Sequence, residues 1–322
     1  MLPLDLSMLW ESADPGDALR ERFGFDGLGA ATAWVGDALE RTWALSVFSC
    51  PRLVISDQNA IIWVSTDRGD LVLKWSRAQE RFPALESSTR VLHHVAEHGV
   101  PVAAPLPAQD GRVRVTLDGP LGPLSAAVLP EVTGHWLDVA DLDAVRSAGS
   151  TLAALHTALR SVGHLPDAGA PSRPAQSGDP AQGPGHWLAV VDRGLAPEDS
   201  RRLARMLAGA PPLEREQQLV HHDYRAANIL VRDSAVVGVL DFDGIEPAHR
   251  VDDLARASVY LATRFTGWGP TPRPARAALR EGYESVQPLS ADEVHWLEIL
   301  TLWYGLTAIP DGAGMEAWVA AL

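Results

Sequence analysis

The chain has 322 residues, 46% of them hydrophobic and 21% charged, which is typical of a globular protein with enough apolar material for two lobes. Its formal net charge of −14 argues against nucleic acid as a partner, because phosphate backbones require basic patches. The acidic balance is compatible with a cationic small substrate and equally with solubility alone. The single cysteine, Cys50, excludes a disulfide framework and a multi-cysteine metal site within the chain.

Membrane and export signals are not expected. The first residues, MLPLDLSMLWESADPGD, have no basic segment before an apolar run, so they do not resemble a signal peptide. No stretch approaches the length of apolar residues that spans a bilayer. We therefore expect a cytoplasmic protein without a membrane partner, either a monomer or a homodimer.

The first half of the chain is rich in strand signals. Alternating β-rich runs on either side of the polar turn TDRGD predict a hairpin, and Gly99 ends a stretch with helical spacing. The expected elements are helices at 15–25 and 30–43, strands at 61–65 and 71–75, a helix at 83–99 and two short strands within 113–134.

Beyond Gly134 the pattern becomes helical. A segment rich in Pro, Gly, Ala and Ser interrupts it, and we interpret this segment as a flexible surface insertion. The expected elements are a helix at 141–162, the insertion at about 162–186, a helix near 197–210, a hairpin within 227–243 and helices to the end.

The segment HHDYRAANILVRDSAVVGVLDFDG, residues 221–244, carries the clearest chemical pattern. Asn228 follows Asp223 by five residues, and two apolar runs separated by RDSA predict a hairpin that ends at Asp241. Because antiparallel strands start and finish together, we expect Asp223, Asn228 and Asp241 to converge at one rim. The alternative is that these polar residues only cap an ordinary turn.

These residue types suit phosphoryl transfer. A carboxylate can orient a hydroxyl or accept its proton, and an amide oxygen with a second carboxylate can hold magnesium. Transfer from ATP further requires a cationic clamp on the phosphates, for which Lys74 in the strand LVLKW is the candidate. The alternative is that Lys74 is a solvated strand lysine.

HHDYRAAN followed by LDFDG resembles the catalytic and metal loops of the aminoglycoside phosphotransferase family, which includes choline and homoserine kinases. RVDDLA, TLAALHTAL and VLPEVTG resemble further elements of that family in the same order, between about Leu53 and Ala262. The resemblance implies an α+β, bilobal protein-kinase-like fold. Residues 1–129 would form a β-rich nucleotide-binding lobe with a helical extension and one inserted helix, and residues 130–322 a larger, mainly helical catalytic lobe.

The resemblance also implies roles and two cofactors, ATP and magnesium. Asp223 would be the catalytic aspartate and Asn228 and Asp241 the metal ligands. Asp253 would support the catalytic loop, with His221 and Asp243 in supporting positions. The implied nucleotide-binding residues are Lys74, Glu86, Ser56, Asn59, Leu129 and Glu131. Glu86 is the expected acidic partner of Lys74, with Glu80 as the second choice and Glu97 too far along the helix.

Some features depart from the family pattern or have two interpretations. No glycine occurs between Cys50 and Asp67, where the nucleotide-covering loop is expected. His222 occupies a position that is usually glycine, which is tolerable at negative φ. His94 and His98 have the spacing of a zinc pair, but without a third ligand we interpret them as surface residues. Arg225 is a candidate contact of the transferred phosphate or of a nearby acid.

Three functional hypotheses remain. The first is a kinase acting on a hydroxyl of a small molecule, such as a cationic amino-sugar antibiotic or a similar metabolite. The second is a kinase of Ser or Thr in a natural-product precursor peptide. The third is a nucleotide-binding pseudokinase or scaffold, which the glycine-free loop favours and the intact Asp223, Asn228 and Asp241 oppose.

Overall fold

The structure is a computed structural model and describes residues 5–162, 182–213 and 217–322. The chain divides into two units. Unit 1 comprises residues 1–97 and 103–132, and unit 2 comprises residues 98–102 and 133–322. The change of unit thus falls between Val132 and Thr133 rather than at the expected 129/130, and the short segment 98–102 belongs to unit 2.

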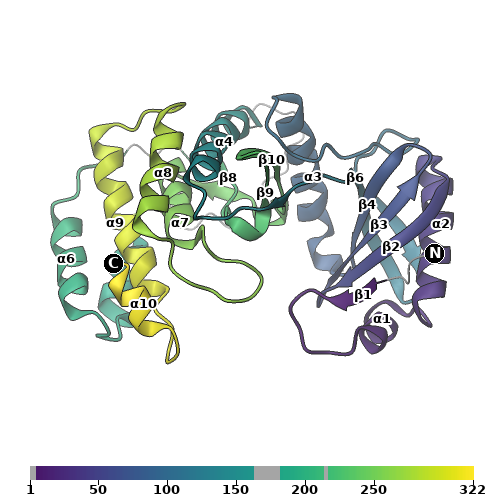
Figure 1. Cartoon of the computed structure of the whole chain (residues 1–322), viewed down its shortest axis with the longest axis horizontal. Helices are drawn as coiled ribbons and strands as arrows, with labels where there is room; N and C mark the ends of the chain where they lie inside the picture. Colours follow the sequence, from purple (N-terminus) through teal and green to yellow (C-terminus); the bar gives the residue numbers. More distant parts are fainter. Residues whose placement is uncertain (1–4, 163–181, 214–216) are drawn as a thin grey trace. The chain divides into compact units, whose positions relative to one another are not determined.

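Unit 1 is built on a six-stranded sheet with strand order β1-β2-β3-β4-β6-β5 (Figure 1). β1 and β2 are parallel and all other neighbours are antiparallel. The strands are β1 Asp5–Met8, β2 Val47–Ile55, β3 Asn59–Thr66, β4 Gly69–Ser76, β5 Val115–Gly119 and β6 Gly122–Pro130. The β3–β4 hairpin and the two strands within 113–134 confirm the sequence-based expectation, whereas β1 and β2 were not expected.

Two helices cover one face of this sheet. α1 (Pro15–Phe23) and α2 (Leu28–Trp43) share a hydrophobic cluster with alternate residues of the strands, including Trp75 of β4. α3 (Phe82–Glu97) lies on the other side of the sheet (Figure 1). Because side chains alternate along a strand, Lys74 belongs to the face opposite the cluster.

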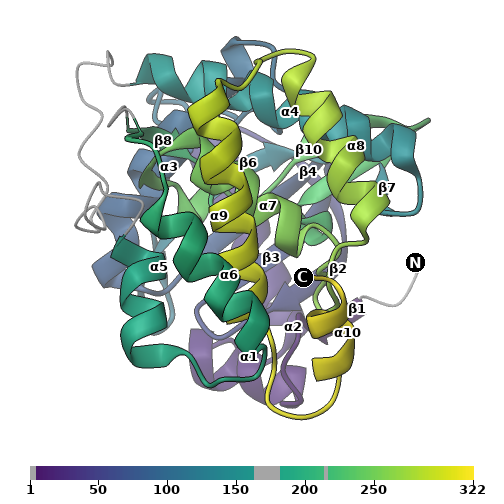
Figure 2. The same cartoon turned by 90° about the vertical axis from the view of Figure 1, so that its left-hand side faces the viewer.

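Unit 2 is mainly helical. Its helices are α4 Leu142–Ser161, α5 Gln182–His186, α6 Pro197–Ala208, α7 Arg250–Tyr260, α8 Arg273–Glu284, α9 Ala291–Thr307 and α10 Met315–Ala320. Figure 2 shows α9 crossing this unit beside α6. Residues 163–181 of the expected insertion lie outside the described residues, and its last part, residues 182–186, is helical and not the loop that its composition suggested.

Small strand pairs in unit 2 hold the motif of residues 221–244. β8 (Gln218–Val220) pairs with β11 (Glu246–Ala248), and β9 (Ile229–Arg232) pairs with β10 (Ala235–Val239) and β7 (His135–Trp136). The expected hairpin is therefore confirmed. One-turn 3-10 segments, Ala226–Asn228 and Phe242–Gly244, flank it.

Helices α4 and α8 pack backbone against backbone. A Cβ atom at Gly149 of α4 would lie 2.0 Å from the carbonyl oxygen of Leu279, and one at Gly282 of α8 would lie 2.0 Å from that of Arg146. Real Cβ atoms never approach this closely, so only glycine permits the crossing. Across the described residues, no helix combines the length and apolar character that crossing a membrane requires.

Candidate active site

Asp253 holds the loop that carries Asp223 through hydrogen bonds to the loop backbone. The Asp253 carboxylate accepts hydrogen bonds from the backbone N–H groups of His221 (3.1 Å) and His222 (2.9 Å). It also contacts His156 Nε2 at 3.0 Å, and its side chain is fully buried. Asp253 lies in the first turn of α7, so the loop is attached to a rigid helix.

Two further helices complete this buried network. His156 of α4 contacts the hydroxyl of Tyr283 of α8 through Nδ1, at 2.8 Å. Burial alone would raise the pKa of Asp253, but the hydrogen bond from His156 and the nearby histidines 221 and 222 lower it to about 2. The carboxylate is therefore held as an anion by its surroundings.

His221 connects the loop to the end of the hairpin. Its Nδ1 accepts the N–H of Asp223 (3.3 Å), and its Nε2 contacts the carbonyl oxygen of Leu240 (2.9 Å). Its ring packs edge-on against Phe242, with ring centroids 5.0 Å apart. Both ring nitrogens are thus used in contacts with loop backbone.

The structure brings Asp223, Asn228 and the end of β10 together. The Asn228 amide nitrogen donates to the carbonyl oxygen (2.9 Å) and to Oδ2 (2.8 Å) of Asp223. Leu240, the residue before Asp241, donates its N–H to the carbonyl oxygen of Asn228 (2.8 Å). Arg225 Nε donates to Asp223 Oδ1 (2.8 Å), so both carboxylate oxygens of Asp223 are oriented.

The donors available at this point suit magnesium. Asn228 contributes an amide oxygen and Asp241 a carboxylate, and both are the hard oxygen ligands that Mg²⁺ prefers. Within the described part of the chain, no group of three or more His, Cys, Asp or Glu side chains is arranged to hold a metal by itself. Mg²⁺ commonly takes its remaining ligands from nucleotide phosphates and water.

His222 adopts a backbone conformation that its residue type disfavours. Its φ is +62°, so the condition under which a non-glycine residue would be tolerated here without strain, a negative φ, is not met. The left-handed region costs a residue with a Cβ atom about 1–2 kcal/mol. Two contacts hold His222 in this conformation. Its Nδ1 pairs with the Glu246 carboxylate, and its carbonyl accepts a hydrogen bond from Arg256 Nε (2.7 Å).

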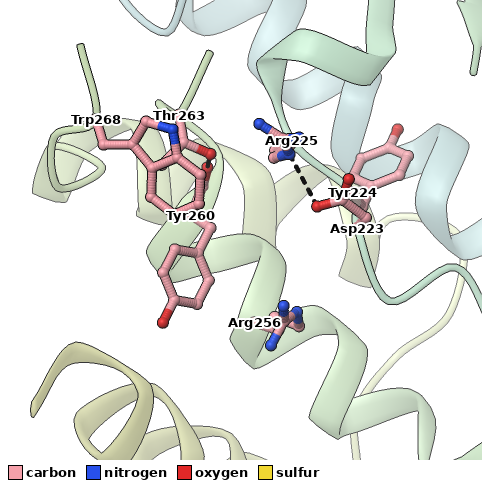
Figure 3. Close-up of a pocket in the computed structure, with 7 residues that line it drawn as sticks. All are labelled: Asp223, Tyr224, Arg225, Arg256, Tyr260, Thr263 and Trp268. Carbon is pink, nitrogen blue, oxygen red and sulfur yellow. Dashed lines mark hydrogen bonds and ion pairs between the residues drawn. The ribbon is translucent and has the colours of Figure 1, made fainter. Parts of the chain in front are cut away.

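A small cavity opens beside Asp223. Its volume is about 120 Å³. Figure 3 shows Arg225 bonded to Asp223 on one side, Trp268, Thr263 and Tyr260 on the other, and Arg256 below. The lining residues are Asp223, Tyr224, Arg225, Arg256, Tyr260, Thr263 and Trp268. Of these, the sequence had singled out only Asp223 and Arg225. The place of Arg256 in RVDDLARA, one helical turn after Asp252 and Asp253, was a signal that could have identified it.

The expected nucleotide-binding residues lie in unit 1. Lys74 is half-buried in β4, opposite Ala127 of β6. Ser56 and Asn59 close the turn between β2 and β3. The Ser56 N–H donates to the Asn59 carbonyl at 2.8 Å, and its hydroxyl contacts the same oxygen at 3.3 Å. Within the glycine-free segment, the connection between β2 and β3 is thus a tight four-residue turn.

The remaining candidates of unit 1 lie on α3 and at the end of β6. Glu86 and the alternative Glu97 are exposed on α3, whose buried face holds Ser88 and Thr89. The alternative Glu80 is exposed in the 3-10 segment Gln79–Arg81 that precedes α3. Leu129 is half-buried, and exposed Glu131 donates its N–H to the Asp70 carbonyl (3.0 Å). A residue that the sequence did not suggest, Arg114, is buried between Ser125 Oγ (2.7 Å) and Thr89 Oγ1 (2.9 Å) and so joins β6 to α3.

Comparison of the coordinates with solved structures defines the class of protein as one with the protein-kinase-like α+β fold. An aminoglycoside phosphotransferase from Alicyclobacillus acidocaldarius matches with a TM-score of 0.60 and 16% identity, over 88% of this chain and 89% of that one. The amicoumacin kinase hAmiN, solved with AMP-PNP, Ca²⁺ and its antibiotic, matches with a TM-score of 0.56 and 14% identity, over 90% of each chain.

Comparison of the amino-acid sequence identifies the family of the protein. The model of the phosphotransferase enzyme family matches residues 55–289, and the chain belongs to that family. A homoserine kinase of Sinorhizobium fredii (strain NBRC 101917 / NGR234) is 27% identical over 250 residues, which are 76% of this chain and 72% of the relative. The protein is therefore a phosphotransferase, a kinase with a hydroxyl group as acceptor.

Proposed function

We propose that the protein is an ATP- and magnesium-dependent kinase that transfers the γ-phosphate to a hydroxyl of a small molecule. The observation that carries this proposal is the constellation around Asp223. Its carboxylate is oriented by Asn228 and Arg225, and Leu240, the residue before Asp241, is hydrogen-bonded to the backbone of Asn228. The nucleotide and divalent cation bound to hAmiN support the same cofactors here.

Asp223 is the proposed catalytic base. In the reaction, the acceptor oxygen forms a bond to the γ-phosphorus, and the bond from that phosphorus to the bridging oxygen breaks, releasing ADP. The proton of the hydroxyl passes to the Asp223 carboxylate. Because both carboxylate oxygens already accept a hydrogen bond, Asp223 is positioned before the acceptor arrives.

Asn228 and Asp241 are the proposed metal ligands, through the amide oxygen and the carboxylate. When bound, magnesium neutralises the phosphate charge that grows during transfer. The 3-10 turn that begins after Asp241 buries Phe242 against His221 and so fixes the direction of the backbone at this ligand. Asp243, in the same turn, and Asp253 below the loop are the proposed supporting carboxylates.

The proposed nucleotide contacts belong to unit 1. Lys74 would bind the α- and β-phosphates, with Glu86 as its acidic partner, and the turn of Ser56 and Asn59 would lie over the phosphates. Leu129 and Glu131 would offer backbone groups to the base. The regular hydrogen bonding of β4 and β6 supports these roles, since it holds Lys74 and Leu129 on rigid strands.

The test is a transfer assay with the purified chain, ATP and magnesium. Candidate acceptors are amino-sugar antibiotics, homoserine, choline and simple alcohols, with detection of the phosphorylated product by mass. Asp223→Asn should lower the rate by about 10²–10⁴-fold. Asp233→Asn is the matched control, because this exposed carboxylate lies on the turn of the same hairpin. Equal rates for Asp223→Asn and the unaltered chain would refute the proposal.

A further inference from the structure

The cavity beside Asp223 is lined by more positive than negative charge. Two arginines, Arg225 and Arg256, contribute to its wall, and Asp223 is the one carboxylate among the lining residues. An acceptor enters this space because its hydroxyl must reach Asp223. The charge of the wall therefore restricts the kind of acceptor that binds.

Arg225 is already engaged. Its Nε donates to Asp223 Oδ1 at 2.8 Å, and its Nη1 lies 3.4 Å from the carbonyl oxygen of Arg264. Its guanidinium also lies over the ring of Trp268, 5.7 Å from the centroid. The charge of Arg225 is thus largely balanced by Asp223, and its position is fixed.

Arg256 differs because its outer nitrogens are not engaged. Its Nε donates to the His222 carbonyl (2.7 Å), and its guanidinium lies 5.3 Å from the ring centroid of Tyr260 and 5.7 Å from that of Tyr304. No hydrogen bond of Nη1 or Nη2 and no ion pair joins Arg256 to any part of the chain that the structure describes. The two aromatic rings hold the guanidinium in place without neutralising it.

Asp252 attracts Arg256 but forms no ion pair with it within the described residues. Asp252 lies one turn earlier on α7, where its Oδ1 accepts a hydrogen bond from the Tyr304 hydroxyl (2.9 Å). Burial raises the pKa of Asp252, so its charged form is disfavoured. Arg256 is therefore a cation at the cavity wall whose two outer amino groups, Nη1 and Nη2, are available to a ligand.

The cavity is also small. Pockets for drug-sized ligands measure roughly 300–1,000 Å³. The volume here is about 120 Å³, which suits an acceptor of a few non-hydrogen atoms. A polycationic amino sugar is disfavoured beside Arg256, because like charges that meet in a pocket repel each other.

We infer that the acceptor is a small hydroxy acid, whose carboxylate is bound by Arg256 while its hydroxyl lies at Asp223. Guanidinium and carboxylate match in geometry and form charge-assisted hydrogen bonds. Arg256 would thus be a specificity-determining residue. This inference rests on the proposed function and narrows its acceptor from hydroxyl compounds in general to those with a carboxylate.

The experiment compares each acid with its own amide in the ATP and magnesium assay. L-serine, L-threonine, L-homoserine and glycerate are tested beside their carboxamides, together with ethanolamine and kanamycin as acceptors without a carboxylate. At least one acid should exceed its amide in kcat/KM by about 10–100-fold, the usual value of a hydrogen bond to a charged group. In Arg256→Gln this ratio should fall towards one, mainly because the KM for the acid rises.

Arg273→Gln is the control, because it removes one exposed arginine of unit 2 that is outside the cavity and should leave the ratio unchanged. Both substrates of a pair are measured on the same preparation, so partial unfolding of a variant cancels in the ratio. A ratio near one in the unaltered chain, transfer to kanamycin or ethanolamine alone, or an unchanged ratio in Arg256→Gln would overturn the inference and leave the kinase activity standing. Absence of transfer to every hydroxyl compound would overturn both.

Discussion

The buried carboxylate of Asp253 should make the catalytic unit sensitive to acid, and Asp253→Asn tests this. The substitution leaves one oxygen to accept the hydrogen bonds that two oxygens accept from His221, His222 and His156. Leaving at least one buried donor without an acceptor costs about 1–3 kcal/mol. Loss of the favourable charge interactions adds to this.

The charge contribution follows from the pKa. The pKa of Asp253 falls from its ordinary value of 3.8 to about 2 in the folded chain. A lowered folded-state pKa contributes stability that is present above pH 3.8 and is lost as the pH falls through 2. The shift corresponds to about 2 kcal/mol. Together with the lost hydrogen bond, Asp253→Asn should cost about 3–5 kcal/mol at neutral pH, as is usual when a buried ion pair is broken.

The assay is urea unfolding of both chains at several pH values between 7 and 3. The difference in unfolding free energy should shrink by about 1 kcal/mol between pH 7 and pH 3, because the rest of the contribution is lost only as the pH falls through 2. Asp252→Asn is the matched control. This substitution keeps an oxygen acceptor for the Tyr304 hydroxyl, and it removes a carboxyl group whose pKa is raised by burial. The difference in unfolding free energy between the unaltered chain and Asp252→Asn should therefore grow, not shrink, as the pH falls. A cost of Asp253→Asn that is the same at every pH would refute the reasoning.

Backbone geometry and the metal ligands lead to the remaining predictions. His222→Ala should be less stable than His222→Gly by about 1 kcal/mol in urea unfolding, because both lose the Glu246 pair but only glycine accepts φ +62° without strain. Gly149→Ala should lower stability by more than about 2 kcal/mol. Its control is Gly36→Ala in α2, where nothing lies near the Cβ position, so this substitution should raise stability by roughly 0.5–1 kcal/mol. Equal melting temperatures of the two variants would contradict this. Asp241→Asn should raise the magnesium concentration for half-maximal activity by an order of magnitude or more; an unchanged requirement in a magnesium titration would remove Asp241 from the metal site.

The parts of the molecule that could be predicted are those with local signals. The hairpin after Asn228 follows from two apolar runs on either side of a short turn, and the approach of its Asp241 end to Asn228 follows from antiparallel pairing. The expected support of the catalytic loop by Asp253 matches the hydrogen bonds that this carboxylate makes. In each case the relevant residues are close in sequence or belong to a specific motif.

The parts that could not be predicted depend on contacts between distant segments. β1 pairs in parallel with the end of β2, at a separation of more than forty residues, and a four-residue strand has no periodicity to identify it. The cavity wall is completed by Trp268, from a segment between α7 and α8 without regular structure. The cationic character that Arg256 gives the cavity is therefore opposite to what the acidic net charge suggested, since net charge says nothing about one site.

The close packing of α4 against α8 at Gly149 and Gly282 limits the substitutions that the enzyme tolerates. It brings His156 and Tyr283 within 2.8 Å of each other, and His156 in turn reaches Asp253 beneath the loop. The shape of the catalytic loop thus depends on Gly149 and Gly282, which have no side chain to contribute to the chemistry. A survey of inactivating substitutions should therefore reveal a second group of sensitive positions along these two helices, at sites that no substrate touches.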